Sequence, residues 1–258
     1  MKQIKIIFFD IDGTLLNMHH KQASKLTLEC LKRLQEHGVY IVLATGRTPS
    51  SLPVFEGIHF DAYITFNGSL CFNDERILYH HPIDHDSVNR ILENASKLHR
   101  PIAIATKDDM AANGYDQDLA DYYAFAHKEL IPSSHFNDLL KEDIYQIMLG
   151  CRKDEYATLM DGVTGAKIAA WWDRAIDVIP AVGGKGVAIE RLLEVFGLSK
   201  EESMAFGDGN NDIEMLQSVG VGVAMGNASE ELKAIADDIC DDVARDGIYY
   251  YCLHHHLI

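Results

Sequence analysis

The chain has 258 residues, 47% of them hydrophobic, which is enough for a sizeable core in one or two domains. Its formal net charge of −16 makes nucleic acid an unexpected partner, because the phosphate backbone would be repelled. Five cysteines without a C-x-x-C pair, no signal-peptide pattern and no apolar run of the ~20 residues that a membrane span needs lead us to expect a cytoplasmic protein with reduced thiols and no membrane partner.

The first 80 residues alternate apolar runs with a helical stretch. Residues 4–9, 39–44 and 61–66 are short apolar runs that predict strands. Residues 24–37 predict a helix, because Leu28, Leu31 and Leu34 repeat at helical spacing and Gly38 follows as a stop signal. Strand, helix and strand at this spacing are typical of a parallel sheet with helices on both faces.

The middle of the chain has a different pattern. Apolar runs predict four strands, at 101–106, 144–149, 167–172 and 175–180. Helical stretches separate them near 85–99, 115–130 and 153–160. The last two strands read as an antiparallel hairpin that turns at Asp173 and Arg174. This region therefore predicts an α+β domain of its own.

The last part returns to the first pattern. We expect helices at 185–196 and 213–219 and strands at 203–206, 221–225 and 234–240. The fold class is therefore α/β, with a doubly wound parallel-sheet (Rossmann-like) core built from residues 1–80 and 181–258. The α+β domain, residues 81–180, is inserted into that core.

Two carboxylates follow the first strand. In the stretch Asp10-Ile11-Asp12, an extended backbone would turn both carboxylates to one face, at the strand end where open α/β sheets bind ligands. A divalent cation such as Mg²⁺, which prefers oxygen ligands, would offset the cost of burying them. The alternative is an ordinary turn, since Asp and Gly are common turn residues.

Two other loops carry groups that could bind an anion. Thr45 and Gly46 follow the second strand and could offer a hydroxyl and N–H groups to a phosphate, although Thr45 could instead cap a helix. Lys185 follows two glycines at a helix start, where the helix dipole disfavours a cation unless an anion is shared. The alternative is a solvated lysine in a flexible linker, and in such a loop we expect it to have little packing role.

The stretch from Gly207 to Asp212 reads GDGNND and places further acidic residues between a strand and a helix. Asn211 or Asp212 could cap the helix, but a cap would not account for the whole cluster. In a doubly wound sheet all four of these segments reach one edge. Carboxylates, a hydroxyl and a cation at that edge predict a metal-and-phosphate site.

These segments resemble the motifs of the haloacid dehalogenase-like (HAD) superfamily, and within it the Cof-type phosphatases with a large α+β cap (type IIB). DIDGT, LATGR, GGKG and GDGNND are similar to the first to fourth motifs, and NGSL and VGVAMGNASEELKAIAD also fit the Cof-type pattern. The resemblance runs from Ile6 to about Gly247 and is weaker in the cap. Val182 precedes the glycines of the third motif, where the relatives have an acidic residue or serine.

The resemblance implies a role for each motif. Asp10 would be the nucleophile that forms an aspartyl-phosphate, and Asp12 would be the general acid and base. Mg²⁺ would be bound by Asp10, the Asp12 carbonyl and Asp208, and Asp212 would orient metal-bound water. The phosphoryl group would be held by Thr45, Gly46, Lys185 and Asn211. The inserted domain would close over the site and read the leaving group.

We therefore expect a Mg²⁺-dependent phosphatase, acting on small phosphorylated metabolites and on sugar phosphates foremost, as a monomer or small homo-oligomer. A phosphomutase and a phospho-accepting signalling module are the alternatives, although Asp12 and the inserted domain argue against the second. Arg47 is a candidate for substrate contact. Trp171 and Trp172 are candidates too, but we expect them chiefly in the core of the inserted domain.

Overall fold

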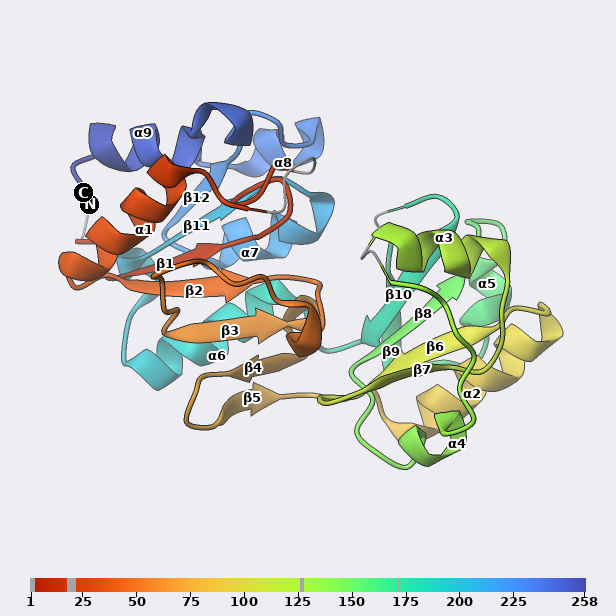
Figure 1. Cartoon of the computed structure of the whole chain (residues 1–258). Helices are drawn as coiled ribbons and strands as arrows, with labels where there is room; N and C mark the ends of the chain where they lie inside the picture. The colour runs from red at the N-terminus through yellow and green to blue at the C-terminus, as the bar shows by residue number, and fades with distance from the viewer. Residues whose placement is uncertain (1–2, 18–21, 126–127, 171) are drawn as a thin grey trace. The chain divides into compact units, whose positions relative to one another are not determined.

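The computed structural model describes residues 3–17, 22–125, 128–170 and 172–258. The chain divides into two compact units (Figure 1). Unit 1 comprises Met1–Gly46, Pro53–His80 and Gly184–Ile258, and unit 2 comprises Arg47–Leu52 and His81–Gly183. The second boundary falls at 183/184, where the sequence placed it at 180/181, and residues 47–52 group with unit 2.

Unit 1 is built on one eight-stranded sheet in the order β13-β12-β11-β1-β2-β3-β4-β5. The neighbours from β13 to β3 run parallel, and β4 and β5 continue the sheet as antiparallel strands. The strands are β1 (Ile6–Phe9), β2 (Tyr40–Ala44), β3 (Ala62–Thr65), β4 (Leu70–Phe72), β5 (Ile77–His80), β11 (Ser203–Gly207), β12 (Val221–Ala224) and β13 (Asp238–Ile239). The α/β fold with a parallel-sheet core is therefore confirmed.

Helices cover both faces of this sheet, so the central strand β1 is fully buried (Figure 1). On one face α1 and α9 lie side by side, and α6 lies on the other. The helices of unit 1 are α1 (Lys25–Glu36), α6 (Lys185–Phe196), α7 (Ile213–Ser218), α8 (Glu230–Ile235) and α9 (Gly247–His254). Short 3-10 turns, η2 (Phe66–Gly68), η3 (Lys200–Glu202), η4 (Asn210–Asp212) and η5 (Val243–Arg245), connect them.

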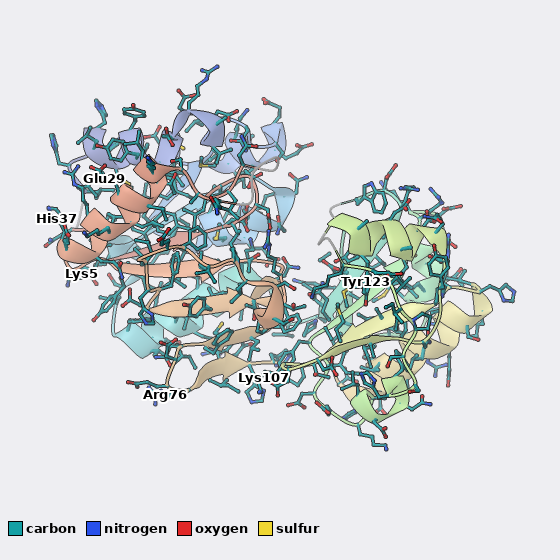
Figure 2. All side chains as sticks on the ribbon, in the orientation of Figure 1. Lys5, Glu29, His37, Arg76, Lys107 and Tyr123 are labelled. Atoms are coloured by element: carbon teal, nitrogen blue, oxygen red, sulfur yellow. The ribbon has the colours of Figure 1, made fainter. Side chains whose placement is uncertain are left out.

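Local sequence signals explain where these helices begin and which side they bury. The side chain of Ser24 caps α1 by accepting a hydrogen bond from the N–H of Thr27 at 2.9 Å. The helix buries Cys30 and Leu31 and leaves Glu29 exposed (Figure 2). Gly197 ends α6 in the left-handed conformation.

Some elements differ from the expectation. The strand expected over residues 234–240 is shortened to β13, because α8 already occupies its first residues. Ser229 caps α8 and Glu230 and Glu231 stand in its first turn, which are signals of a helix start. β4 and β5, which are only three and four residues long, were not expected as separate strands.

Unit 2 is a five-stranded antiparallel sheet in the order β7-β6-β8-β10-β9. Its strands are β6 (Ile102–Ala105), β7 (Met110–Ala112), β8 (Gln146–Gly150), β9 (Ala166–Ala169) and β10 (Ala175–Pro180), and its helices are α2 (His85–Lys97), α3 (Gln117–Phe125), α4 (Phe136–Leu139) and α5 (Tyr156–Leu159). The turn η1 (Pro49–Ser51) also belongs to it. The antiparallel β9–β10 pair confirms the expected hairpin.

The hydrophobic core of unit 2 lies on one side of its sheet. Alternate residues of three neighbouring strands contribute to it, among them Ile104, Ile147 and Ile176, all fully buried. Ile91 of α2 packs into the same cluster. Of the helices in the part of the chain that the structure describes, none is long and apolar enough to span a membrane.

Candidate active site

The first pair of acidic residues lies where β1 ends. β1 stops at Phe9, and the N–H of Asp10 donates to the carbonyl of Phe206 on the neighbouring strand at 3.0 Å. Residues 11–16 then turn back, so the strand alternation that would place both carboxylates on one face does not continue. Asp10 is nearly fully buried, whereas Asp12 is partly exposed.

The turn after β1 is held against the loop that carries Asp208. Gly13 has a φ of +89°, and a Cβ there would lie 2.1 Å from Oδ2 of Asp208, so the close approach requires glycine. Thr14 Oγ1 donates to Asp208 Oδ1 at 2.9 Å. Asn227 Nδ2 donates to the carbonyl of Gly13 at 2.8 Å. Neither Thr14 nor Asn227 was singled out from the sequence, although both lie in segments that carry the family resemblance.

Lys185, the first residue of α6, is the centre of the buried charge. Its Nζ donates to Asp10 Oδ1 at 2.5 Å and to Asp212 Oδ1 at 2.6 Å. The residue is only 1% exposed, so the alternative of a solvated linker lysine is wrong, and so is the expectation of little packing role. The cation is stable at a helix start because two carboxylates face it.

The loop after β11 places two further carboxylates beside this ion pair. Asp212 is fully buried, and its Oδ2 accepts the N–H groups of Asp208 and Gly209 at 2.9 and 3.1 Å. Among the described residues, Asp10, Asp208 and Asp212 each offer a carboxylate oxygen, and these oxygens lie within 4.8 Å of one another. The carboxylate of Asp12 is not part of this group.

Burial controls the protonation of these groups. It raises the pKa of Asp10 well above the ordinary value, an effect that Lys185 opposes and the other two carboxylates increase. Burial, together with the charge of Asp212, raises the pKa of Asp208 to about 7. Burial alone would lower the pKa of Lys185, but Asp10 and Asp212 outweigh it and raise that pKa above its ordinary value. The lysine is therefore held charged.

The segments expected to bind phosphate meet around Asn67, a residue of the stretch NGSL that was not predicted as a site residue. The N–H of Asn67 donates to the carbonyl of Thr45 at 3.0 Å. Asn211 Nδ2 donates to Asn67 Oδ1 at 3.3 Å. A Cβ on Gly46 would lie 2.9 Å from the same oxygen. The available signal was an Asn-Gly pair at the end of a predicted strand.

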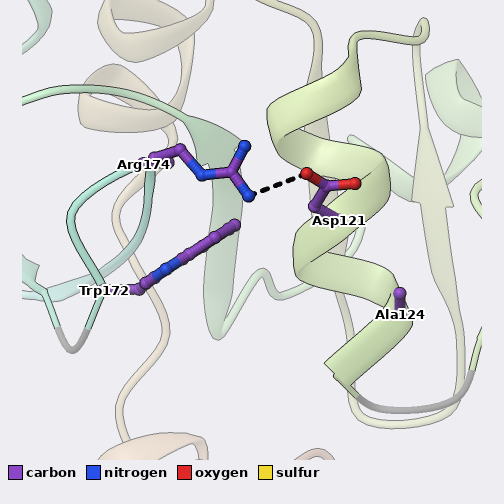
Figure 3. Close-up of a pocket in the computed structure, with 4 residues that line it drawn as sticks. All are labelled: Asp121, Ala124, Trp172 and Arg174. Carbon is purple, nitrogen blue, oxygen red and sulfur yellow. Dashed lines mark hydrogen bonds and ion pairs between the residues drawn. The ribbon is translucent and has the colours of Figure 1, made fainter.

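The remaining candidates belong to unit 2. Arg47 donates from Nη1 to the carbonyl of Ser51 at 3.0 Å. Trp171 lies outside the described residues. Trp172 is partly exposed and lines a pocket of about 390 Å³ with Asp121, Ala124 and Arg174 (Figure 3). The guanidinium carbon of Arg174 lies 4.3 Å from the centre of the Trp172 ring, so the expectation of a core position is wrong for Trp172.

A family model of haloacid dehalogenase-like hydrolases matches residues 7–252. The chain belongs to this family. It is 32% identical over 252 residues to the protein named "Putative phosphatase YkrA" of Bacillus subtilis (strain 168), and the match covers 95% of each chain.

Two solved structures of haloacid dehalogenase phosphatases share the fold over nearly the whole chain. One, from Bacteroides thetaiotaomicron, has a TM-score of 0.92 at 27% identity, and covers 99% of this chain and 96% of that one. The other, a subclass IIB sugar phosphatase, has a TM-score of 0.86 at 29% identity, and covers 98% of this chain and 100% of that one. These findings confirm the resemblance and identify this haloacid dehalogenase-like hydrolase as a phosphatase.

Proposed function

We propose that this phosphatase is Mg²⁺-dependent, hydrolyses small phosphorylated metabolites through an aspartyl-phosphate on Asp10, and acts on sugar phosphates foremost. The observation that carries the proposal is the buried contact of Lys185 with Asp10 and Asp212, beside Asp208. A cation among carboxylates at a sheet edge suits phosphoryl transfer, which depends mainly on positioning and charge neutralisation. The likeness to a subclass IIB sugar phosphatase supports the substrate class.

The donor set of unit 1 fits a magnesium ion. Three carboxylates, Asp10, Asp208 and Asp212, and one ammonium, Lys185, leave two formal negative charges in a buried cluster. All the candidate ligand atoms are oxygens, which Mg²⁺ prefers. Asp10, Asp208 and the carbonyl of Asp12 would hold the ion, with Asp212 beside them. When bound, it would supply positive charge that stabilises the ionised carboxylates and the oxygens of the phosphoryl group.

The two carboxylates after β1 have different work in this proposal. An oxygen of Asp10 attacks phosphorus, the bond from phosphorus to the leaving oxygen breaks, and Asp12 gives that oxygen a proton. In the second half, Asp12 takes a proton from a water molecule that attacks phosphorus. The bond between Asp10 and phosphorus then breaks, and inorganic phosphate leaves. The partial exposure of Asp12 suits a group that exchanges protons with substrate and water.

Four residues would hold the transferring phosphoryl group. Thr45 and Gly46 would offer a hydroxyl and N–H groups from the loop after β2, and Asn211 an amide from η4. Lys185 would neutralise charge, since its pKa is held above the ordinary value and it stays protonated. These groups come from the first and the third of the sequence ranges that make up unit 1.

Two observations support a reducing compartment, and we propose that the enzyme is cytoplasmic. Cys30, Cys71, Cys151, Cys240 and Cys252 are all buried, and none forms a disulfide.

The test is a screen of phosphorylated metabolites for released phosphate, with and without Mg²⁺. We expect turnover of sugar phosphates that requires the metal and disappears in Asp10→Asn. Release that is equal with and without Mg²⁺, or that survives in Asp10→Asn, would contradict the mechanism. Turnover confined to another class of phosphate ester would contradict the proposed substrates and leave the mechanism standing.

A further inference from the structure

The turn η2 after β3 has an unusual backbone. Three successive residues have positive φ angles: Phe66 at 51°, Asn67 at 52° and Gly68 at 102°. Glycine adopts such angles freely and asparagine tolerates them, but for a bulky residue such as Phe66 they are strained. Strained backbone persists where surrounding contacts impose it, and it is concentrated at functional sites. Here the fully buried side chain of Phe66 anchors the turn.

The strained turn places the side chain of Asn67 between two of the segments that we propose hold phosphate. Asn67 is 6% exposed, and its Oδ1 accepts from Asn211 Nδ2 at 3.3 Å. A Cβ on Gly46 would lie 2.9 Å from Oδ1 and 3.0 Å from Nδ2 of Asn67. Glycine at position 46 therefore leaves room for this amide beside the loop after β2.

The side-chain amides of Asn67 and Asn211 leave N–H groups available to a ligand. Within the ranges that the structure describes, Asn67 Oδ1 is engaged by Asn211, while Asn67 Nδ2 donates to no residue. The Asn211 Oδ1 atom is turned toward Gly209, where it would lie 2.6 Å from a Cβ. Among the described residues, the fully buried side-chain N and O atoms without a partner are Ser69 Oγ and Gln146 Oε1, so Asn67 Nδ2 is accessible and can donate to a ligand that reaches it. The acceptor that fits such donors is an anion.

We propose that Asn67 is a further phosphoryl-binding residue, whose amide N–H donates to an oxygen of the transferring phosphoryl group beside Asn211. This rests on the proposed function. The strained turn then has a purpose: it holds the N–H donor of Asn67 rigidly beside the loop of Thr45 and Gly46, where a regular β-turn would not place it. Asn suits the position because it tolerates a positive φ and also carries an N–H donor.

Two substitutions separate ligand binding from a purely structural role. Asn67→Gly removes the amide but favours the observed φ, so a residue needed only for the turn would be replaced without loss. Asn67→Gly also removes the oxygen that accepts from Asn211, whereas Asn67→Asp keeps an oxygen for that contact, keeps the size of the side chain and exchanges its N–H for a charged oxygen. The matched control is Asn73→Gly, because Asn73 Oδ1 accepts the N–H groups of Glu75 and Arg76 in the β4–β5 hairpin of the same unit.

The probe is inorganic phosphate, measured as a competitive inhibitor of p-nitrophenyl phosphate hydrolysis in Mg²⁺ buffer. We expect Asn67→Gly to keep the wild-type circular dichroism spectrum and to weaken phosphate inhibition about ten- to a hundredfold, as for the loss of a hydrogen bond to a charged group. KM should rise with the inhibition constant. Asn67→Asp should lose at least as much, and Asn73→Gly should match the wild type.

The possible results distinguish this inference from the proposed function. If the wild type neither hydrolyses the ester nor binds phosphate, the proposed function fails and this inference fails with it. If the wild type is inhibited by phosphate and Asn67→Gly is inhibited equally, the inference alone is overturned. Should Asn67→Gly not fold, the inhibition constant of Asn67→Asp decides, and a wild-type value would overturn the inference.

Discussion

Lys185 and Asp10 are 175 positions apart in the sequence, yet Nζ of the lysine lies 2.5 Å from Oδ1 of the aspartate, with both residues buried. Asp10 belongs to the loop after β1, and Lys185 begins α6, which follows the inserted unit 2 in the sequence. The contact therefore forms only when the two parts of unit 1 have come together. The closure of the unit 1 fold and the buried charge of the candidate active site depend on this same pair of residues.

Replacing Lys185 should thus affect both rate and stability. Lys185→Ala removes the cation that faces Asp10 and Asp212 and leaves two buried carboxylates unpaired. We expect kcat/KM to fall ~10²–10³-fold, as for the loss of one electrostatic stabiliser. The free energy of unfolding of the metal-free protein should fall by about 3–5 kcal/mol, as when one partner of a buried ion pair is removed.

Steady-state kinetics and urea unfolding measure these two effects. Lys32→Ala is the matched control, because Lys32 is an exposed residue of α1 in the same unit. It should change neither quantity appreciably. Wild-type kinetics in Lys185→Ala would show that Lys185 is not the lysine of the third motif.

Chelation of the metal should reduce activity to background. Asp10, Asp208 and Asp212 repel one another when no cation is bound, so Mg²⁺ should also raise the melting temperature by binding only the folded site. Differential scanning fluorimetry with and without Mg²⁺ and EDTA measures this. Asp208→Asn should abolish the Mg²⁺-dependent increase. Full turnover in excess EDTA would contradict the assignment of the acidic cluster.

The affinity for Mg²⁺ should depend on pH near neutrality. With a pKa raised to about 7, Asp208 carries a proton at pH 6 that must leave before the carboxylate can bind a cation. The dissociation constant of Mg²⁺, measured by calorimetry, should therefore fall as the pH rises from 6 to 8. A constant that does not change over this range would show that Asp208 is already ionised.

The same raised pKa should make the metal-free protein less stable, not more, as the pH rises. A carboxyl group whose pKa is raised in the folded state binds more protons there than in the unfolded chain, between its ordinary 3.8 and about 7. The contribution of Asp208 to the free energy of unfolding should thus decrease as the pH rises through this window. Urea unfolding in EDTA at several pH values measures it, and Asp208→Asn should depend less on pH.

Sequence patterns predicted which segments come together at the candidate site but not how their side chains meet. Apolar runs followed by Asp10 or Asp208 indicated strand ends, because parallel strands deliver such residues to one edge. The burial of Lys185 could not be read from its glycine-rich neighbours, since it depends on two carboxylates from other segments. The separation of Asp12 from the acidic cluster depends on a turn that begins one residue after Asp10. The position of the Asn67 side chain depends on the strained turn η2, for which the Asn-Gly pair is only a weak sequence signal.

The five cysteines should be unreactive in the folded protein. All are buried, and burial raises the pKa of Cys151 and Cys240 to about 12, so the thiolate that reacts with disulfide reagents is scarce at pH 8. Titration with Ellman's reagent should release little colour within minutes from the native enzyme and the equivalent of five thiols in denaturant. A thiol that reacts rapidly in the native protein would contradict this.

The division of labour between Asp10 and Asp12 can be tested with an activated substrate. Asp10→Asn should abolish both turnover and phosphoenzyme, because an amide oxygen is a poor nucleophile. Asp12→Asn keeps the backbone and removes only proton transfer, which is worth ~10²–10⁴ in rate. p-Nitrophenyl phosphate has a leaving group that needs no proton, so Asp12→Asn should still form the aspartyl-phosphate from it.

In Asp12→Asn the aspartyl-phosphate should then accumulate, because no base activates the water that would hydrolyse it. Intact-protein mass spectrometry after rapid quench would show the added phosphoryl group, and Asp10→Asn treated in the same way is the matched control. The structure makes this a sharp comparison, since Asp10 contacts Lys185 and belongs to the buried acidic cluster, whereas the carboxylate of Asp12 lies outside that cluster. If Asp12→Asn formed no phosphoenzyme from the activated ester, the two residues would not divide as nucleophile and acid–base, and the mechanism proposed here would have to be abandoned.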